Sequence, residues 1–469
     1  MKTRSAKITD EMMIVLIACC MGVFLMPLMS SMMNLANVPI GIEFDVGAKA
    51  LGLVNSIFLL ASVTVMVPFA RMSDIVGRKT IFIAGLATAV FGSILAYFTP
   101  SFEILLVARF IMGAGSAALS VSAVAMITDV FPFERRGWAI GLQATFVYVG
   151  IMFGPFLGGI ICDLLGWRNL FLFMLPIALL AFVLILFYKK ERRSDVWKKM
   201  DYKGALLYSV TITLTMYGVI NLPNIWAILM IAAGLLMLFL FIWTMKRTES
   251  PVLEIGIFKH KVFTRACLAA YMNYASCYSV AFFLSLYLVK IGGLSLSTAG
   301  IILLTQPFFQ VLLTWYFGHI SDKIADKRIL PTAGMALISA GVFLIIFIGI
   351  EVNLPYIFVI LVLLGVGYGM FAAPNTNAVM SALPPRNRGE ASGMIALVRQ
   401  IGMMTSMGIA MCTISVIMGT VDNLTDPDTW ESFIKVIEAA FTICLAMCIA
   451  GTFFSWFRGD TRKKEPASQ

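Results

Sequence analysis

Two stretches of the first half of the chain, ARMSDIVGRK at residues 70–79 and PFERRGWAIG at residues 132–141, have counterparts in the second half. GHISDK at residues 318–323 matches the first stretch. PPRNRGEASG at residues 384–393 repeats the pattern P-x-x-x-R-G-x-A-x-G of the second, 252 positions later. Self-similarity of this kind predicts two structurally related halves. In a hydrophobic chain, related halves that rock around a central axis are the architecture of alternating access.

The composition indicates a membrane protein. The chain has 469 residues, of which 60% are hydrophobic and 13% charged, whereas a soluble domain has about 25% charged residues. Segments without any charge, such as those between Glu11 and Glu43 and between Lys79 and Glu103, reach the ~20 residues of a membrane-spanning helix. Counting such segments predicts an all-α polytopic protein with about fourteen transmembrane helices.

The predicted spans divide as six, two and six. The uncharged segment between Lys203 and Lys246 is too long for one helix and is interrupted by Asn221-Leu222-Pro223-Asn224, which predicts a two-helix hairpin. We expect a first six-helix bundle at residues 1–190, connectors with the extra hairpin at 191–262, and a second, pseudo-symmetric bundle at 263–469. The charged tail from Arg458 is predicted to be disordered.

The net charge of +10 is explained by orientation rather than by nucleic-acid binding. Assigning Lys and Arg to alternate loops leaves only Lys49, Arg168, Lys290 and Lys435 on one side, apart from two arginines inside spans. Positive residues gather in cytoplasmic loops and interact with anionic lipid headgroups. The sequence therefore predicts a multi-pass protein of the cell membrane with both termini cytoplasmic, partnered by the bilayer and not by nucleic acid.

No chemistry-bearing motif of an enzyme is present. All eight cysteines lie in apolar segments without a C-x-x-C pair, which argues against a metal site. Neither an H-E-x-x-H motif nor a phosphate-binding loop occurs. We expect neither metal nor cofactor, and no enzymatic activity.

Residues 70–79 resemble the loop motif G-x-L-A-D-x-x-G-R-K of the major facilitator superfamily, which joins spans two and three. Asp74, Gly77, Arg78 and Lys79 fit the motif. The resemblance implies that Asp74 accepts hydrogen bonds from Arg78 and from the opposite half, and so latches the cytoplasmic gate. The alternative is an ordinary solvated turn. Further gating residues are expected where the repeats match, at Asp322, Arg136 and Arg388.

Two further motifs support the resemblance. RFIMGAG at residues 109–115 is similar to the span-four motif R-x-x-x-G-x-G, which implies that Arg109 assists proton or substrate movement. The alternative is an arginine that snorkels to the interface. GIMFGPFLGG at residues 150–159 resembles the span-five motif of exporters, although helix packing alone would also explain its glycines. The expected gating residues of this motif are Gly150, Gly154, Pro155, Gly158 and Gly159.

Residues 166–176 and 399–402 resemble the fourteen-span drug:proton antiporter branch, but one feature of that branch is missing. Its members carry an Asp in span one, where this chain has Met29-Ser30, and no Asp or Glu lies deep in any span. A buried carboxylate is the natural proton carrier and counter-ion for a cationic drug. Two arginines inside spans, Arg109 and Arg399, favour a neutral or anionic substrate instead.

Polar residues inside the spans predict a central path, because such groups need partners or water in hydrocarbon. Each could instead join neighbouring helices. Besides the two arginines, the predicted path residues are Ser30, Asn34, Asn37, Gln143, Tyr148, Tyr271, Tyr274, Tyr278, Gln306, Gln310, Asn375 and Asn377.

The predicted function is secondary active export of hydrophobic or amphipathic small molecules by alternating access, with proton antiport. Two alternatives stay open on the sequence. One is an uncoupled facilitator or a lipid or glycolipid flippase of the same fold. The other is a membrane sensor that binds a ligand without carrying it.

Overall fold

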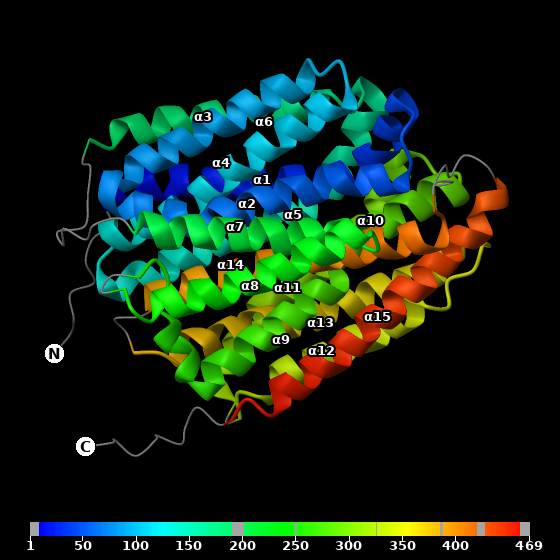
Figure 1. The fold of residues 1–469 in the computed structure, drawn as a ribbon. Helices are drawn as coiled ribbons and strands as arrows, with labels where there is room; N and C mark the ends of the chain where they lie inside the picture. The colour runs from blue at the N-terminus through cyan, green and yellow to red at the C-terminus, as the bar shows by residue number, and fades with distance from the viewer. Residues whose placement is uncertain are drawn as a thin grey trace.

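The computed structural model describes residues 9–189, 201–248, 251–324, 326–384, 388–419 and 427–459, without the side chains of residues 133, 134, 322, 323 and 388–390. Within these ranges every regular element is a helix (Figure 1). Thirteen helical segments are long and apolar enough to cross a bilayer, and α12 (Ile329–Ile345) is a shorter apolar helix. The predicted all-α class with about fourteen spans is confirmed.

The first bundle contains six helices joined by short turns. They are α1 (Asp10–Phe44), α2 (Ala48–Val76), α3 (Arg78–Tyr97), α4 (Phe102–Val130), α5 (Phe133–Leu165) and α6 (Asn169–Phe187). Thr9 and Ser101 cap α1 and α4 by accepting hydrogen bonds from backbone amides. Gly77 alone separates α2 from α3, at a φ of 131° that favours glycine.

The second bundle repeats this arrangement. Its helices are α9 (Lys261–Cys277), which continues as α10 (Ser279–Leu286) and η2 (Tyr287–Ile291), then α11 (Leu296–Lys323), α12, α13 (Leu354–Ser381), α14 (Arg388–Ile417) and α15 (Trp430–Trp456). In the first bundle α1 packs on α5 and α6, and α4 on α2 and α3. In the second, α9 packs on α14 and α15, and α13 on α11 and α12. The sequence repeat is therefore a repeat of helix packing.

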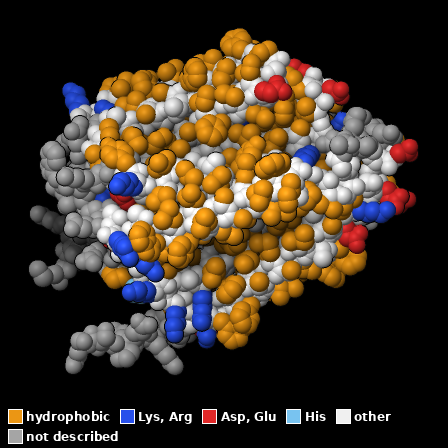
Figure 2. Space-filling view, viewed as in Figure 1, with side chains coloured by type: hydrophobic (Ala, Val, Ile, Leu, Met, Phe, Trp, Pro, Cys, Tyr) orange, Lys and Arg blue, Asp and Glu red, His pale blue; other side chains and the backbone are white. Residues whose placement is uncertain are grey.

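The hairpin consists of α7 (Tyr202–Ile220) and α8 (Ile225–Met245), with its turn at the position that the sequence predicted. α7 packs on α2 and α14, and α8 packs on α7. Leu236 and Phe239 of α8 are 67% and 69% exposed. The face of the molecule over this hairpin is broadly hydrophobic (Figure 2). Two short 3₁₀ helices, η1 (Ile255–Lys259) and η4 (Pro427–Thr429), precede α9 and α15.

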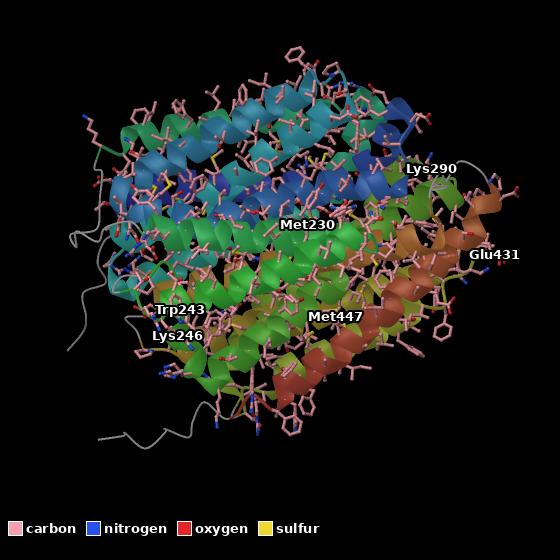
Figure 3. All side chains as sticks on the ribbon, viewed as in Figure 1. Met230, Trp243, Lys246, Lys290, Glu431 and Met447 are labelled. Atoms are coloured by element: carbon pink, nitrogen blue, oxygen red, sulfur yellow. The ribbon has the colours of Figure 1, made fainter. Side chains whose placement is uncertain are left out.

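The two ends of the bundle differ in charge. Lys and Arg gather at one end, and most visible Asp and Glu at the other (Figure 2). We name the first the basic end and the second the far end. Trp243 and Lys246 lie at the basic end, and Lys290 and Glu431 lie at the far end (Figure 3). α1 begins and α15 ends at the basic end (Figure 1).

The prediction of a disordered tail is wrong for Arg458, which is 1% exposed. Its Nη1 donates to Asn375 Oδ1 over 3.3 Å, and its Nη2 donates to the carbonyl oxygen of Lys327. Burial lowers the pKa of Arg458 to about 10, so the guanidinium stays charged at neutral pH. Asn375 in turn donates to the carbonyl of Ala266 over 3.1 Å. Asn375, predicted to line the path, therefore anchors α13, α9 and the end of α15.

Candidate functional site between the two bundles

One face of α5 meets α11 of the other bundle. Gly141, Tyr148, Pro155 and Gly159 are spaced by seven, seven and four residues, so they share one side of the helix. At the far end this side is in backbone contact. A Cβ on Gly159 would overlap the carbonyl of Leu296, and a Cβ on Gly300 of α11 would overlap the carbonyl of Pro155. Toward the basic end, a Cβ at Gly141 would have no described heavy atom within 4 Å beyond its own turn of helix. The two helices touch at the far end and part at the basic end.

The contact between α2 and α14 has the same form as that between α5 and α11, and we name these two contacts the seams between the bundles. The sequence repeat places the residues of α14 that are equivalent to those of α5 252 positions later. Met411, the counterpart of Gly159, lies 3.0 Å from a Cβ at Gly52 of α2. Gln400, the counterpart of Tyr148, donates to Ser62 Oγ over 3.3 Å. Gly393, the counterpart of Gly141, likewise has no heavy atom of another described segment within 4 Å of its Cβ position. Both seams are closed at the far end and open at the basic end.

Polar contacts hold the far end together. Asp163 at the end of α5 accepts hydrogen bonds from the amide nitrogen of Ser297, over 2.7 Å, and from its hydroxyl. Lys49 Nζ donates to Ser415 Oγ over 2.9 Å. Each of these contacts joins one bundle to the other. The far end is therefore closed by charge-assisted hydrogen bonds as well as by glycine contacts.

A polar cluster lies between the closed far end and the parted basic end. We name Ser30, Arg109, Tyr148, Tyr274 and Tyr278 the central cluster. Ser30 Oγ of α1 and Tyr278 Oη, at the junction of α9 and α10, lie 3.0 Å apart, and the phenol groups of Tyr148 and Tyr274 are within electrostatic reach of each other. The cluster thus joins the two bundles halfway along the spans.

Arg109 is the most unusual member of the central cluster because it is fully buried and incompletely paired. Its Nε donates to the carbonyl of Val54 over 3.1 Å, and its guanidinium lies 4.5 Å from the ring centroid of Phe58. Among the described residues neither Nη1 nor Nη2 has a hydrogen-bond acceptor. The guanidinium is within electrostatic reach of Tyr278. Buried charges without partners are costly, so this group presents donors suited to an acceptor from elsewhere.

Arg399 of α14 brings a second positive charge to the same region. It is half-buried and within electrostatic reach of Tyr148. In the described part of the chain no ion pair joins Arg399 or Arg109 to an acid. The region therefore combines guanidinium groups with phenols and hydroxyls.

The other predicted path residues divide between paired and unpaired amides. Asn34 Oδ1 accepts a hydrogen bond from Asn55 over 3.1 Å. Asn37 is buried with both side-chain amide atoms unpartnered, and Gln143 is buried with its Oε1 unpartnered, among the described residues. Tyr271 Oη lies 3.2 Å from Thr405 Oγ1 in the second bundle. Asn37 and Gln143 are thus further buried groups with unused hydrogen-bonding capacity.

Three predicted path residues remain on α11 and α13. Gln310 of α11 is buried and Gln306, one turn earlier, is half-buried. Asn377 of α13 is exposed. Among the described residues, no hydrogen bond joins Asn375 or Asn377 to the central cluster.

The predicted gate residues form contacts inside the first bundle. Arg78 Nη2 donates to Asp74 Oδ1 over 3.0 Å, and Nη1 of the same guanidinium pairs with Asp129 of α4. Lys79 Nζ donates to the carbonyl of Tyr188 over 2.6 Å. No described side chain of the second bundle forms a hydrogen bond or ion pair with Asp74. In this state, with the basic end parted, Arg78 bridges two carboxylates of its own bundle.

Three more gate residues lie at the same end. Arg136 Nε donates to the carbonyl of Phe131 over 2.9 Å, which fixes the start of α5. The side chains of Asp322 and Arg388 lie outside the described residues. In the equivalent turn of the second bundle, the hydrogen bond from Arg328 holds the pKa of Asp326 below its usual value.

The glycines at 150, 154 and 158 pack α5 on α1 of the same bundle. A Cβ on Gly150 would lie 2.9 Å from the carbonyl oxygen of Phe24, and one on Gly154 would overlap Ser31. A Cβ on Gly158 would lie 2.9 Å from the Cα atom of Met32. This face of α5 allows two backbones to approach within the bundle, while Pro155 and Gly159 meet the other bundle.

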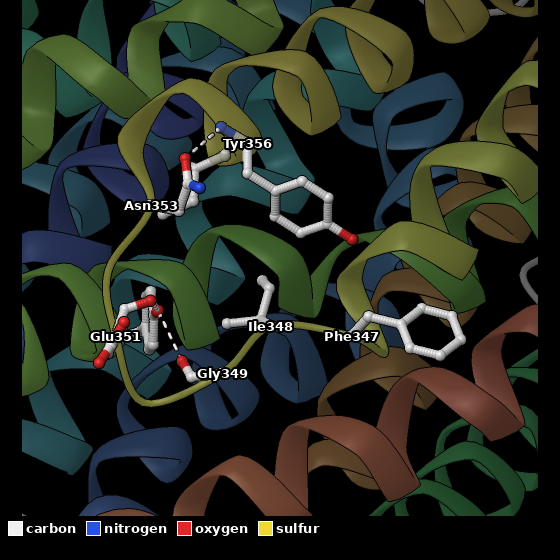
Figure 4. Close-up of a pocket in the computed structure, with 8 residues that line it drawn as sticks. Phe347, Ile348, Gly349, Glu351, Asn353 and Tyr356 are labelled. Carbon is white, nitrogen blue, oxygen red and sulfur yellow. Dashed lines mark hydrogen bonds between the residues drawn. The ribbon is translucent and has the colours of Figure 1, made fainter.

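A pocket of about 430 Å³ opens elsewhere, at the far end of the second bundle (Figure 4). Tyr287 Oη donates to the carbonyl of Gly349 over 2.8 Å, and Asn353 Oδ1 accepts from the amide of Tyr356 over 3.1 Å. Glu351 is exposed beside them. These groups satisfy one another in the turn between α12 and α13. The pocket is lined by one bundle only, unlike the central cluster.

Several partners in this region could not be predicted from the sequence. Phe58 and the carbonyl of Val54 hold Arg109, yet both are ordinary apolar residues of α2. Tyr368 of α13, with its ring 6.4 Å from that of Tyr274, was likewise not predicted. Helical periodicity would place these residues on inward faces but would not name their partners.

The fold and the central cluster define a membrane carrier built from two repeated bundles. The family model of the Major Facilitator Superfamily matches residues 19–407 and 266–469. The chain belongs to this superfamily and is a transporter, not an enzyme. Among similar proteins, the riboflavin transporter RibZ of Clostridioides difficile is 26% identical over 445 residues, covering 95% of this chain and 97% of that protein. Multidrug resistance protein 3 of Bacillus subtilis is 27% identical over 420 residues, covering 86% and 79%.

Solved structures share the fold. A bacterial homologue of the human lysosomal transporter Spinster, in an inward-facing and unoccupied conformation, has a TM-score of 0.70 at 16% identity, covering 96% of this chain and 98% of that one. A POT family transporter in complex with a thioalcohol-conjugated peptide has a TM-score of 0.71 at 14% identity, covering 94% and 96%.

Proposed function

We propose that this transporter exports neutral or anionic amphipathic small molecules from the cytoplasm across the cell membrane, in exchange for protons. In this proposal the basic end is cytoplasmic, because Lys and Arg concentrate in cytoplasmic loops. The structure then corresponds to an inward-facing state. The observation that carries the proposal is the central cluster, which joins the two bundles between a closed far end and a parted basic end.

Arg109 and Arg399 support a neutral or anionic substrate. Two Nη atoms of the buried Arg109 have no acceptor among the described residues. A carboxylate, phenolate or carbonyl oxygen of a substrate would supply one. The rings of Tyr148, Tyr274 and Tyr278 offer aromatic surface beside these charges. The names of the relatives, a riboflavin transporter and a multidrug resistance protein, are in keeping with an aromatic substrate.

Proton exchange would use the acids at the basic end. Arg78 bridges Asp74 and Asp129 in the present state. Closure of this end would break that arrangement as Asp74 and its counterpart Asp322 latch across the bundles. A change of partners alters the proton affinity of a carboxylate, which is the requirement for coupling transport to a proton gradient.

An uncoupled facilitator is the second candidate, and one observation favours it. The central cluster contains no carboxylate, so substrate and proton do not compete for one acid there. The substrate gradient alone would then set the direction of transport.

Everted membrane vesicles with a fluorescent probe test the proposal. Riboflavin serves as the neutral probe and fluorescein as the anionic one. Antiport predicts accumulation that stops when the pH gradient is collapsed. Accumulation that is indifferent to the collapse refutes coupling and favours the facilitator. Binding of either probe to purified protein without any accumulation in proteoliposomes would instead support the sensor.

A further inference from the structure

The two seams between the bundles are equivalent by the sequence repeat, but among the described residues a further helix covers the seam between α2 and α14 alone. α7 lies against α2 and α14 together. Tyr208 Oη donates to the carbonyl of Val63 over 2.8 Å, and Ser209 Oγ donates to that of Thr64 over 3.0 Å. Near the far end Val219 fits so closely against Gly408 of α14 that a Cβ there would overlap it. α7 is thus held by both bundles.

The hairpin also seals the parted, basic half of this seam. A hydrophobic core that is separate from the main one contains Val67 of α2, Tyr208 of α7, Phe241 of α8, and Met394 and Leu397 of α14. The hairpin therefore excludes lipid where α2 and α14 separate. On this side of the protein the acyl chains would contact the outward face of α8 and not the seam between α2 and α14.

The seam between α5 and α11 has no such cover in the part of the chain that the structure describes. α5 packs mainly on α1 and α11, and α11 on α13 and α5, and among the described residues the hairpin has at most marginal contact with either helix. Gly137 and Gly141 have no described heavy atom within 4 Å of their Cβ positions apart from their own stretch of helix. Gly318 of α11 is eighteen residues, a whole number of turns, after Gly300, which touches α5. Its Cβ position has only Ala373 within 4 Å, at 3.6 Å. Open space thus adjoins α5 at Gly137 and Gly141, whereas Gly318 faces α13 of its own bundle.

Two exposed tryptophans lie on the basic halves of α5 and α11. Trp138 precedes Gly141 by three residues and is 50% exposed, and Trp315 precedes Gly318 by three and is 71% exposed. Tryptophan rings favour the boundary between headgroups and acyl chains. They would stand where a molecule dissolved in the leaflet meets the parted helices.

We propose that amphiphiles dissolved in the leaflet at the basic end enter the central cluster sideways, between α5 and α11, and that the hairpin closes the equivalent route between α2 and α14. This inference rests on the proposed function for its substrate, since it specifies that the substrate is one that partitions into the bilayer. The asymmetry between the seams is a property of the chain itself and is tested without transport.

The test compares the repeat-related residues Gly141 and Gly393. Each is replaced by cysteine and labelled with bimane in a Cys412→Ser background, because Cys412 is the one cysteine of the eight that is not buried. Gly137→Cys provides a second position on the open seam. The labelled proteins are reconstituted with phosphatidylcholine carrying a nitroxide on its acyl chain, and in parallel exposed to aqueous iodide.

We expect iodide to quench the bimane at both sites, since both face the parted basic end. Nitroxide lipid should reduce the fluorescence at positions 141 and 137 and leave that at 393 unchanged. Equal quenching by nitroxide lipid at 141 and 393, or none at 141 and 137, would overturn the proposal. If iodide quenches the bimane at neither position 141 nor position 393, the proposal is overturned as well. A transporter that fails the vesicle assay but shows the expected quenching pattern would lose the proposed function and retain the lateral opening.

Discussion

Replacing Arg109 by Met should separate the two roles that a buried arginine can have. The guanidinium makes one hydrogen bond, to Val54, and one ring contact, to Phe58. These contribute about 1–3 kcal/mol together. Burying the charge costs several kcal/mol of folding free energy. The two Nη atoms offset none of this cost, because neither donates a hydrogen bond to a described residue. Arg109→Met is therefore expected to melt at the same temperature as the parent, or higher.

Transport by Arg109→Met should be impaired although its stability is retained. A substrate oxygen bound to a charged donor contributes about 1.5–3 kcal/mol, so losing one such bond raises KM by about 10- to 100-fold. Initial uptake rates in everted vesicles, over a range of fluorescein concentrations, measure this shift. Arg458→Met is the matched control: its guanidinium is paired with Asn375 and Lys327, so the variant should lose stability. An Arg109→Met protein that melts several degrees lower yet keeps its KM would refute the reasoning.

Three further substitutions test the packing and the gates. Gly154→Leu should lower the free energy of unfolding by about 1–3 kcal/mol because the side chain overlaps α1, whereas Gly141→Leu, in open space, should melt like the parent; equal melting of both variants would contradict this. Asp163→Asn should weaken the closed far end by about 1–2 kcal/mol, since Ser297 loses a charged acceptor. Spin labels at the far ends of α5 and α11 would then show a larger fraction of molecules at long distances. An unchanged distance distribution would contradict a role of Asp163 in closing the far end. Arg78→Gln should reduce proton-driven transport without altering membrane abundance, and a parental rate would remove that residue from the gate.

The number of spans, the hairpin and the repeat could be predicted because they depend on patterns along the chain. Charge-free segments of membrane-spanning length need only composition to be recognised. The turn at residues 221–224 is marked by its own polar residues and proline. Repeat-related residues fall on equivalent helix faces because equal spacing gives equal rotation.

Which end of the carrier is open could not be predicted, because it depends on contacts between residues far apart in the sequence. Nothing local distinguishes Gly141, which faces open space, from Gly159, which touches the other bundle. Arg458 illustrates the same limit. Its place in a charged tail predicts a solvated side chain. The guanidinium is instead buried, because it donates hydrogen bonds to the carbonyl oxygen of Lys327 and to Oδ1 of Asn375. That anchor also gives Asn375 a structural role that the sequence did not predict.

The far end is joined in part by contacts that have no side chain to remove. Gly159 meets the main chain of Leu296, and Gly300 meets that of Pro155. Alanine at Asp163, Ser297, Lys49 or Ser415 removes a polar contact of this gate, whereas alanine at either glycine adds a Cβ that overlaps the opposite main chain. Variants trapped with the opposite side open should therefore be recovered at these glycines by the smallest possible enlargement.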